Sequence, residues 1–268
     1  MSSNEEMRLN KWIAHGSRYS RREADRLIAE GRVCIDGVVV SDMGRMVQPG
    51  QKVTVDDRPV QIQHDQYTVI VYHKPKGELV TKSDPRERKT IYHDLPGKFR
   101  HFIPVGRLDY ASEGVLLMTD APWIADTLMH SSLPRTYNVK IDGEMTEKIM
   151  EAARSGLILE DATKGAHEKT RVTRMEIAPF LALEVLKNSR NYTRLRLTLG
   201  EGKNREIRRF FAHFGRNVLD LKRVAFGPFE LNMLPVGKTR YLSKGEYAKL
   251  RELISTLRKD DLHGDTHR

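Results

Sequence analysis

A polar stretch over residues 56–66, DDRPVQIQHDQ, divides this chain of 268 residues into a short segment and a long one. We interpret the stretch as a linker, because a chain of this length is expected to form one large domain plus a small module. The sequence therefore predicts a small domain over residues 7–62 and a large domain over residues 67–255. Residues 256–268 lack apolar periodicity, and we expect them to form a flexible tail.

The apolar runs of the chain are short. TVIVY (68–72) and GVLLM (114–118) are far shorter than the roughly 20 residues that a membrane-spanning helix requires. The first residues, MSSNEEMRLNKW, are polar and lack the apolar region of a secretory signal. The single cysteine, Cys34, cannot form an intramolecular disulfide, and no Cys/His pair has zinc-ligand spacing. We therefore expect a cytoplasmic protein with no metal and no membrane segment.

The charge balance favours a polyanionic partner. Forty-six Lys and Arg residues oppose thirty-six Asp and Glu residues, which leaves a formal net charge of +10. An excess of this size is typical of proteins that bind nucleic acid, although an ordinary basic surface gives the same balance.

The small domain reads as two helices followed by a small sheet. Ser20 is placed to cap the second helix, and Gly31 is placed to end it. Asp36 and Gly37 follow as a hairpin signal, since this dipeptide tolerates the positive φ angles of a tight turn. The sequences LNKWIAHG, SRREADRLIAEGRVCIDG and PGQKV resemble the αL RNA-binding domain of ribosomal protein S-four.

Basic residues are concentrated around these two helices. They repel one another unless an anion is nearby, although a solvated helix face is the alternative. We therefore expect contact with RNA phosphates. The residues are Arg8, Lys11, Arg18, Arg21, Arg22, Arg26 and Arg32.

The large domain alternates strands and helices in no regular βαβ order. YTVIVYH, GVLLMTD, TYNVKID and YTRLRLTL read as strands, and the last shows a clear period of two. We therefore predict an α+β fold whose mixed sheet is mainly antiparallel.

The segment PVGRLDYASEGVLLMTD, residues 104–120, presents Asp109 just before a buried strand. Loops on a rigid scaffold suit catalysis, although an isolated aspartate at such a position is more often a turn or capping residue. The segment resembles the central motif of pseudouridine synthases, with Ser112 in place of the usual threonine. The resemblance is strongest to the ribosomal RNA group that comprises the small-subunit synthase A and the large-subunit synthases B, E and F. It implies that Asp109 is the catalytic residue.

Two further segments match the same family. In RTYNVKI (135–141), Tyr137 is usually a packing residue, but by resemblance its ring stacks on the target uracil. In LGEGKNREIRRFFAHFG (199–215), Ile207 and Arg208 match the motif whose basic residue pairs with the catalytic aspartate, while Glu206 replaces the common glutamine. A helical wheel places Arg205 and Arg209 toward phosphate or solvent. We also expect RNA contacts from Lys74, Lys76, Arg107, Lys203 and Asn204.

The resemblance implies isomerisation of uridine to pseudouridine in ribosomal RNA, a reaction without net redox change that needs no cofactor. The basic loop KPKGELVTKSDPRERKTIYHDLP favours 23S rRNA, free or in ribosome-assembly intermediates, and 16S rRNA is the nearest alternative. A non-catalytic ribosome-assembly factor is a different class, which the presence of Asp109, Tyr137 and Arg208 together disfavours. A methyltransferase would need a Gly-rich cofactor turn, and none follows a strand here. We expect a monomer.

Overall fold

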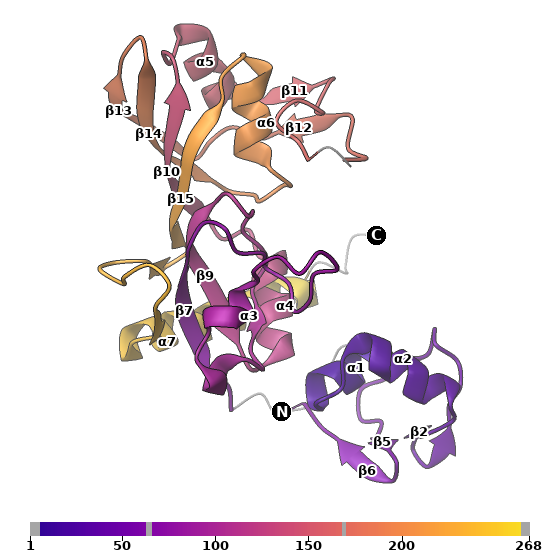
Figure 1. Ribbon diagram of the computed structural model, residues 1–268. Coiled ribbons are helices and arrows are strands. Elements are labelled where there is room, and N and C mark those ends of the chain that lie inside the picture. Colours follow the sequence, from indigo (N-terminus) through magenta and orange to yellow (C-terminus); the bar gives the residue numbers. More distant parts are fainter. Residues whose placement is uncertain (1–5, 63–65, 168–169, 264–268) are drawn as a thin grey trace. The chain divides into compact units, whose positions relative to one another are not determined.

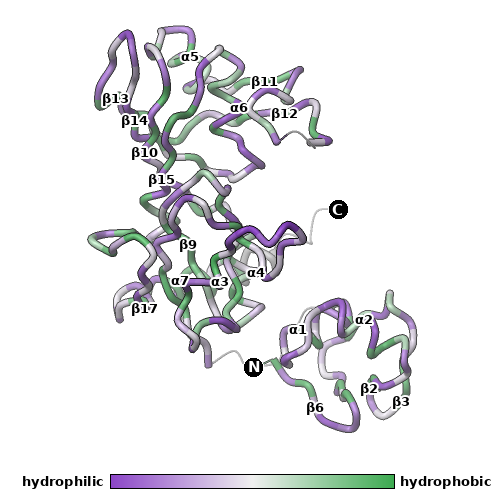
Figure 2. Tube along the Cα trace, viewed as in Figure 1, coloured by the Kyte–Doolittle hydropathy of each residue, from purple (hydrophilic) through white to green (hydrophobic). Residues whose placement is uncertain are grey.

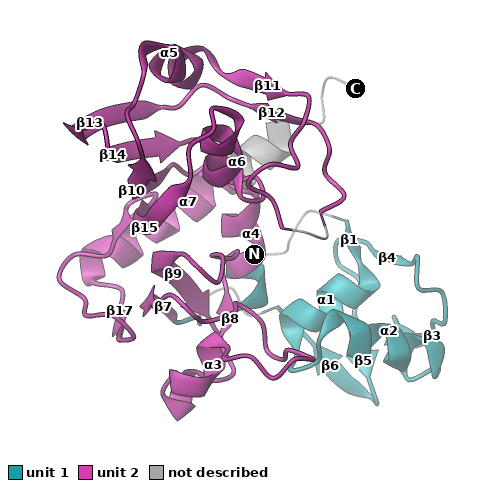
Figure 3. Ribbon diagram, turned by 45° about the horizontal axis from the view of Figure 1, so that its top comes forward, with its two compact units in different colours: residues 1–68, 121–124 teal, residues 69–120, 125–268 magenta. Residues whose placement is uncertain are grey.

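The computed structural model describes residues 6–62, 66–167 and 170–263. The chain forms two compact units, each described by itself: residues 1–68 with 121–124, and residues 69–120 with 125–268 (Figure 3). We call them the small unit and the large unit.

The small unit contains two helices and short strands. Its elements are β1 (Met7–Arg8), α1 (Leu9–Gly16), α2 (Arg21–Ala29), β2 (Val33–Ile35), β3 (Val38–Val39), β4 (Met46–Val47), β5 (Val53–Val55) and β6 (Arg58–Val60). Strands β3, β2, β5 and β6 form one sheet in that order, and β1 pairs with β4. The Ser20 side chain accepts from the Glu23 N–H in a capping box, which confirms the predicted helix start. Asp36 and Gly37 have φ angles of 52° and 82°, which confirms the predicted hairpin turn.

Part of the polar stretch interpreted as a linker is a strand. Asp56 and Asp57 make a turn with φ angles of 48° and 61°, and β6 then returns along β5. Val60 is buried in the core of the small unit with Ile13 and Ile28. Residues 58–60 therefore complete the small sheet, and residues 63–65 of the interpreted linker lie outside the described residues.

The large unit is built on a nine-stranded sheet (Figure 1). Its main path runs β13 (Ala182–Asn188), β14 (Tyr192–Leu199), β10 (Arg135–Asp142), β15 (Val218–Phe226), β9 (Glu113–Thr119), β7 (Val69–Lys74) and β17 (Thr239–Tyr241). β8 (Ile103–Pro104) pairs with β9, and β16 (Phe229–Glu230) pairs with β15. The pair β9–β15 is parallel and the other described pairs of this sheet are antiparallel, which confirms the predicted α+β fold.

Helices and a separate two-stranded sheet complete the large unit. The helices are α3 (Ile91–Asp94), the 3-10 turn η1 (Gly97–Phe99), α4 (Pro122–His130), α5 (Glu147–Ser155), α6 (Glu206–His213) and α7 (Lys244–His263), and β11 (Leu157–Leu159) pairs with β12 (Met175–Ile177). Residues 256–263 of the predicted tail extend α7, while residues 264–268 lie outside the described part. In the described part of the chain, every helix is too short or too polar to cross a membrane.

The alternation of β10 and β14 orients the functional side chains. Tyr137 and Val139 face the same core as Leu195 and Leu197, and this core includes Phe210 of α6. Both hydrophobic and hydrophilic residues occur along these strands (Figure 2), because the opposite face carries polar side chains. Tyr137 and α6 are thereby placed on one side of the sheet.

Candidate active site

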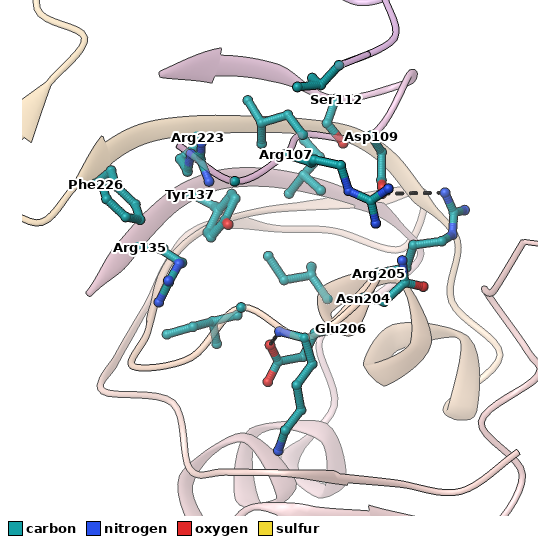
Figure 4. Close-up of a pocket in the computed structure, with 18 of the residues that line it drawn as sticks. Arg107, Asp109, Ser112, Arg135, Tyr137, Asn204, Arg205, Glu206, Arg223 and Phe226 are labelled. Carbon is teal, nitrogen blue, oxygen red and sulfur yellow. Dashed lines mark hydrogen bonds and ion pairs between the residues drawn. The ribbon is translucent and has the colours of Figure 1, made fainter. Parts of the chain in front are cut away.

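The three predicted segments meet at one cavity of the large unit, with a volume of about 570 Å³ (Figure 4). Asp109, Tyr137, Ile207 and Arg208 all line it. Further lining residues include Arg107, Ser112, Arg135, Lys203, Asn204, Arg205, Glu206, Arg223 and Phe226.

Asp109 lies in the loop between β8 and β9. Leu108 anchors the loop because it is buried in the core, and the Ser112 N–H donates to the Asp109 carbonyl at 3.0 Å. Gly114 allows β9 to approach β15: a Cβ there would lie 2.1 Å from the Arg223 carbonyl oxygen, and its φ of 122° disfavours other residues. The Asp109 side chain remains 30% exposed, so its carboxylate is accessible from the cavity.

Two arginines of the third segment reach the Asp109 carboxylate. Arg205 Nη1 lies 3.4 Å and Arg208 Nε lies 3.7 Å from the same oxygen, Oδ2. Arg208 was expected there, whereas the expectation that Arg205 faces phosphate or solvent is wrong. Arg205 precedes α6 in a left-handed conformation with φ of 53°, so a helical wheel does not describe its direction.

Arg208 is fixed by several acceptors besides Asp109. Its Nη1 donates to the Val218 carbonyl at 3.1 Å, and its Nη2 reaches the Ala111 carbonyl at 3.3 Å and the Ser112 hydroxyl at 3.4 Å. Ser112 is buried, so its hydroxyl contributes to orienting the guanidinium. Burial lowers the pKa of Arg208, and the positive charge of Arg205 lowers it further.

Tyr137 presents its ring to the cavity from the middle of the sheet. It is 8% exposed and pairs across strands with Leu197 of β14 and Arg223 of β15. An aromatic ring held on a rigid strand offers a flat surface against which an unstacked base can lie.

Lys74 and Arg209 are buried, so the expected RNA contacts of these two residues are wrong. Lys74 Nζ donates to the carbonyls of Pro75, Asp109 and Ser112 at 2.8, 3.2 and 3.0 Å, and burial lowers its pKa to about 8. It thus holds the loop that presents Asp109. Arg209 is 1% exposed, and its guanidinium donates to the carbonyls of Ala162 and Asn204.

The other expected RNA contacts lie on accessible surface. Lys76 is exposed and pairs with Asp220 at 2.6 Å, and Arg107 is exposed beside the cavity. Lys203 pairs with Glu201 at 2.8 Å, while the Asn204 side-chain oxygen accepts from Arg209. Their contact with RNA stays a prediction.

In the small unit, the basic residues predicted to contact RNA are exposed apart from Lys11, which is half-buried. Arg32 is occupied by Asp56 at 2.6 Å and Glu30 at 3.0 Å. Within the described ranges, Arg21 and Arg22 form no ion pair, which leaves their charge available to a ligand.

Sequence reasoning missed four residues of the cavity: Arg135, Glu206, Arg223 and Phe226. Glu206 was noted only as a departure from glutamine, yet it is 3% exposed and accepts from the Lys203 N–H at 3.0 Å. Burial, and then the neighbouring Glu201, raise the pKa of Glu206 to about 8. Among the described residues, no group of three or more His, Cys, Asp or Glu side chains is arranged to hold a metal ion.

Comparison with known proteins gives consistent matches along most of the chain. A model of the RNA pseudouridylate synthase family matches residues 68–213, and one of the S4 domain matches residues 7–53. An uncharacterized RNA pseudouridine synthase of Helicobacter pylori strain J99 is 48% identical over 93% of this chain and 95% of its own length. The ribosomal large subunit pseudouridine synthase B of Bacillus subtilis strain 168 is 32% identical, over 92% and 96%. A crystal structure of a pseudouridylate synthase shares the fold, with a TM-score of 0.61 and 24% identity over 91% and 99%.

Proposed function

Since the chain belongs to the RNA pseudouridine synthase family, whose members are isomerases that act on RNA, we propose that it converts uridine to pseudouridine in 23S ribosomal RNA. The observation that carries the proposal is the cavity in which an accessible carboxylate, Asp109, lies beside two guanidinium groups and an aromatic ring. The reaction breaks the bond between ribose C1′ and uracil N1, turns the base, and rejoins it through C5.

The target nucleotide must leave its stack before it can enter a cavity of this kind, which costs a few kcal/mol. In the proposed complex, Tyr137 stacks on the extruded uracil and offsets part of that cost. Asp109 faces the ribose and acts either as a nucleophile at C1′ or as a base that removes a ribose proton. Arg205 and Arg208 hold its carboxylate in place.

The S4 domain supplies a separate basic surface for the substrate. Exposed Arg18, Arg21 and Arg22 suit phosphate contacts, which fix the position of an RNA without reading its sequence. We propose that this unit holds structured ribosomal RNA, free or in an assembly intermediate, while the large unit modifies it. The enzyme would act as a monomer in the cytoplasm, where ribosomes assemble.

Two alternatives differ in the RNA or in the activity. Relatives named ribosomal large subunit pseudouridine synthase B, including one of Pseudomonas aeruginosa that is 34% identical, favour 23S over 16S rRNA. A non-catalytic assembly factor would have no need for the ion pairs that hold Asp109 at an accessible cavity.

The proposal is tested by mapping pseudouridines across both ribosomal RNAs from cells with and without the gene. We expect one position in 23S rRNA to lose its modification, and a plasmid copy of the gene to restore it. Loss of a position in 16S rRNA instead would reject the substrate, and unchanged maps of both RNAs would reject the function.

A further inference from the structure

Two arginines flank Tyr137 on the cavity side of the sheet (Figure 4). Arg223 of β15 is the direct cross-strand partner of Tyr137, and Arg135 lies two residues before it on β10. Both guanidinium groups lie over the ring of Phe226, with their carbon atoms 5.3 and 5.0 Å from its centre. The aromatic plate on which the base is proposed to lie is thus bordered by two positive charges.

These charges are buried and have no carboxylate partner. Arg135 is 9% exposed and Arg223 is 4% exposed. Arg135 Nη1 donates to the Leu133 carbonyl at 2.9 Å, and Arg223 Nε donates to the Val115 carbonyl at 2.8 Å. Among the residues that the structure describes, neither forms an ion pair, in contrast to Arg205 and Arg208.

Two buried cations side by side are unfavourable until an anion reaches them. Burial lowers the pKa of Arg135, and the positive charge of Arg223 lowers it further. Glu206 does not compensate at neutral pH, because its raised pKa keeps it largely protonated. The site therefore favours a ligand that brings negative charge to this side of the cavity.

The surrounding backbone fits closely around both side chains. A Cβ on Gly202 would lie 2.9 Å from Arg135 Nε, and a Cβ on Gly114 would lie 2.1 Å from the Arg223 carbonyl oxygen. Because a larger residue at either glycine would displace an arginine or its strand, the two guanidinium groups are held in fixed positions. Fixed donors need no reorganisation when charge develops beside them.

Breaking the C1′–N1 bond creates such a charge on the base. The electron pair of that bond passes to N1 and spreads onto the carbonyl oxygens O2 and O4 of uracil. At the ribose, either an Asp109 oxygen forms a bond to C1′, or a ribose proton passes to Asp109. When C5 bonds to C1′, the ester bond breaks back to Asp109 or the proton returns to ribose. C5 then loses its proton and N1 gains one, so the net reaction is an isomerisation. Both routes release uracil as an anion.

We propose that Arg135 and Arg223 bind the departing uracil anion and donate hydrogen bonds to its carbonyl oxygens. The inference rests on the proposed function and adds a role for these two residues within it. A phosphate of the RNA is a different ligand for the same charges. The base is favoured because both arginines border Tyr137 and are more than nine-tenths buried, whereas the backbone of an extruded nucleotide must continue out of the cavity.

The test compares Arg135→Met and Arg135→Lys with the wild type in single turnover, with enzyme in saturating excess over an RNA fragment that carries the target uridine. Arg135→Met should react about 100-fold or more slowly, the effect of removing one donor from a developing anion. Arg135→Lys keeps the positive charge and should recover much of that loss. Arg196→Met, exposed on β14 on the opposite face of the sheet, is the matched control and should react like the wild type.

A second substrate separates charge stabilisation from a merely structural role. The same RNA is made with 5-fluorouridine at the target, and consumption of that nucleotide is followed by nucleoside mass spectrometry. Because fluorine itself stabilises the departing anion, Arg135→Met should slow this substrate several-fold less than it slows uridine. A structural defect would slow both substrates equally, and that result would overturn the inference.

RNA affinity measured at several salt concentrations identifies a phosphate contact. The inference expects equal affinity and equal salt dependence for Arg135→Met and the wild type. A weaker affinity, with a salt slope lowered by about 1, would assign Arg135 to a phosphate and overturn it. If Arg135→Met does not fold by circular dichroism, Arg135→Gln is compared on the same two substrates with the same criterion. An inactive wild type would reject the proposed function, whereas an active wild type with equally active Arg135 variants would reject this inference alone.

Discussion

Replacing Glu206 with glutamine should change how the stability of the protein depends on pH. Glu206 is 3% exposed, and burial with the nearby Glu201 raises its pKa from 4.5 to about 8. The folded protein therefore holds a proton on Glu206 that the unfolded chain releases above pH 4.5. A group that binds its proton more tightly in the folded state contributes stability at low pH and loses it as the pH rises toward the folded pKa.

The size of the effect follows from the two pKa values. Between pH 4.5 and 8 the free energy of unfolding should fall by about 1.4 kcal/mol per pH unit through this residue, on the order of 5 kcal/mol in total. Glu201, whose pKa is lowered, acts in the opposite sense only below its ordinary value of 4.5. Glutamine keeps an oxygen that can accept from the Lys203 N–H, and it does not titrate.

The assay is urea unfolding of the wild type and Glu206→Gln at pH 5, 6, 7 and 8. The variant should become progressively more stable relative to the wild type as the pH rises. Glu252→Gln, on the exposed side of α7, is the control and should leave the pH dependence unchanged. Parallel stability curves for the wild type and Glu206→Gln would refute the buried, protonated carboxyl.

Two further predictions concern the sheet and the S4 domain. Gly114→Ala should lower the free energy of unfolding by at least about 2 kcal/mol, because its φ is 122° and its Cβ would meet the Arg223 backbone, whereas Gly97→Ala, with open space around it, should be nearly neutral by thermal unfolding. Arg21→Gln combined with Arg22→Gln should weaken binding to ribosomal RNA and lower the salt slope by about 2, and an unchanged slope would place the RNA elsewhere.

Much of the fold was legible from local sequence because the relevant forces are local. The Ser20 cap, the Asp36-Gly37 turn and the alternation of β14 each depend on neighbouring residues. The helix after Arg205 was also predicted, since Ile207 and Phe210 recur at helical spacing on its buried face. Strand β6 was missed, because a polar RPV segment shows no alternation and is ordered by pairing with β5.

The site was legible where a motif brought its residues together and obscure where burial depends on distant strands. Lys74 and Arg209 look like surface charges, but carbonyl groups from remote segments surround them. Arg223 becomes a cavity residue only through its register opposite Tyr137, and the left-handed conformation of Arg205 turns its side chain toward Asp109. These outcomes depend on sheet register and backbone conformation, which short sequence patterns do not specify.

The most direct test of the central claim is single-turnover pseudouridine formation by Asp109→Asn on a 23S rRNA fragment that the wild type modifies. The variant should bind this RNA with wild-type affinity and form no pseudouridine, because the amide neither attacks C1′ nor accepts a proton. Asp57→Asn, at an exposed turn of the small unit, should retain wild-type activity. Measurable pseudouridine from a preparation of Asp109→Asn free of wild-type enzyme would contradict the catalytic role of Asp109.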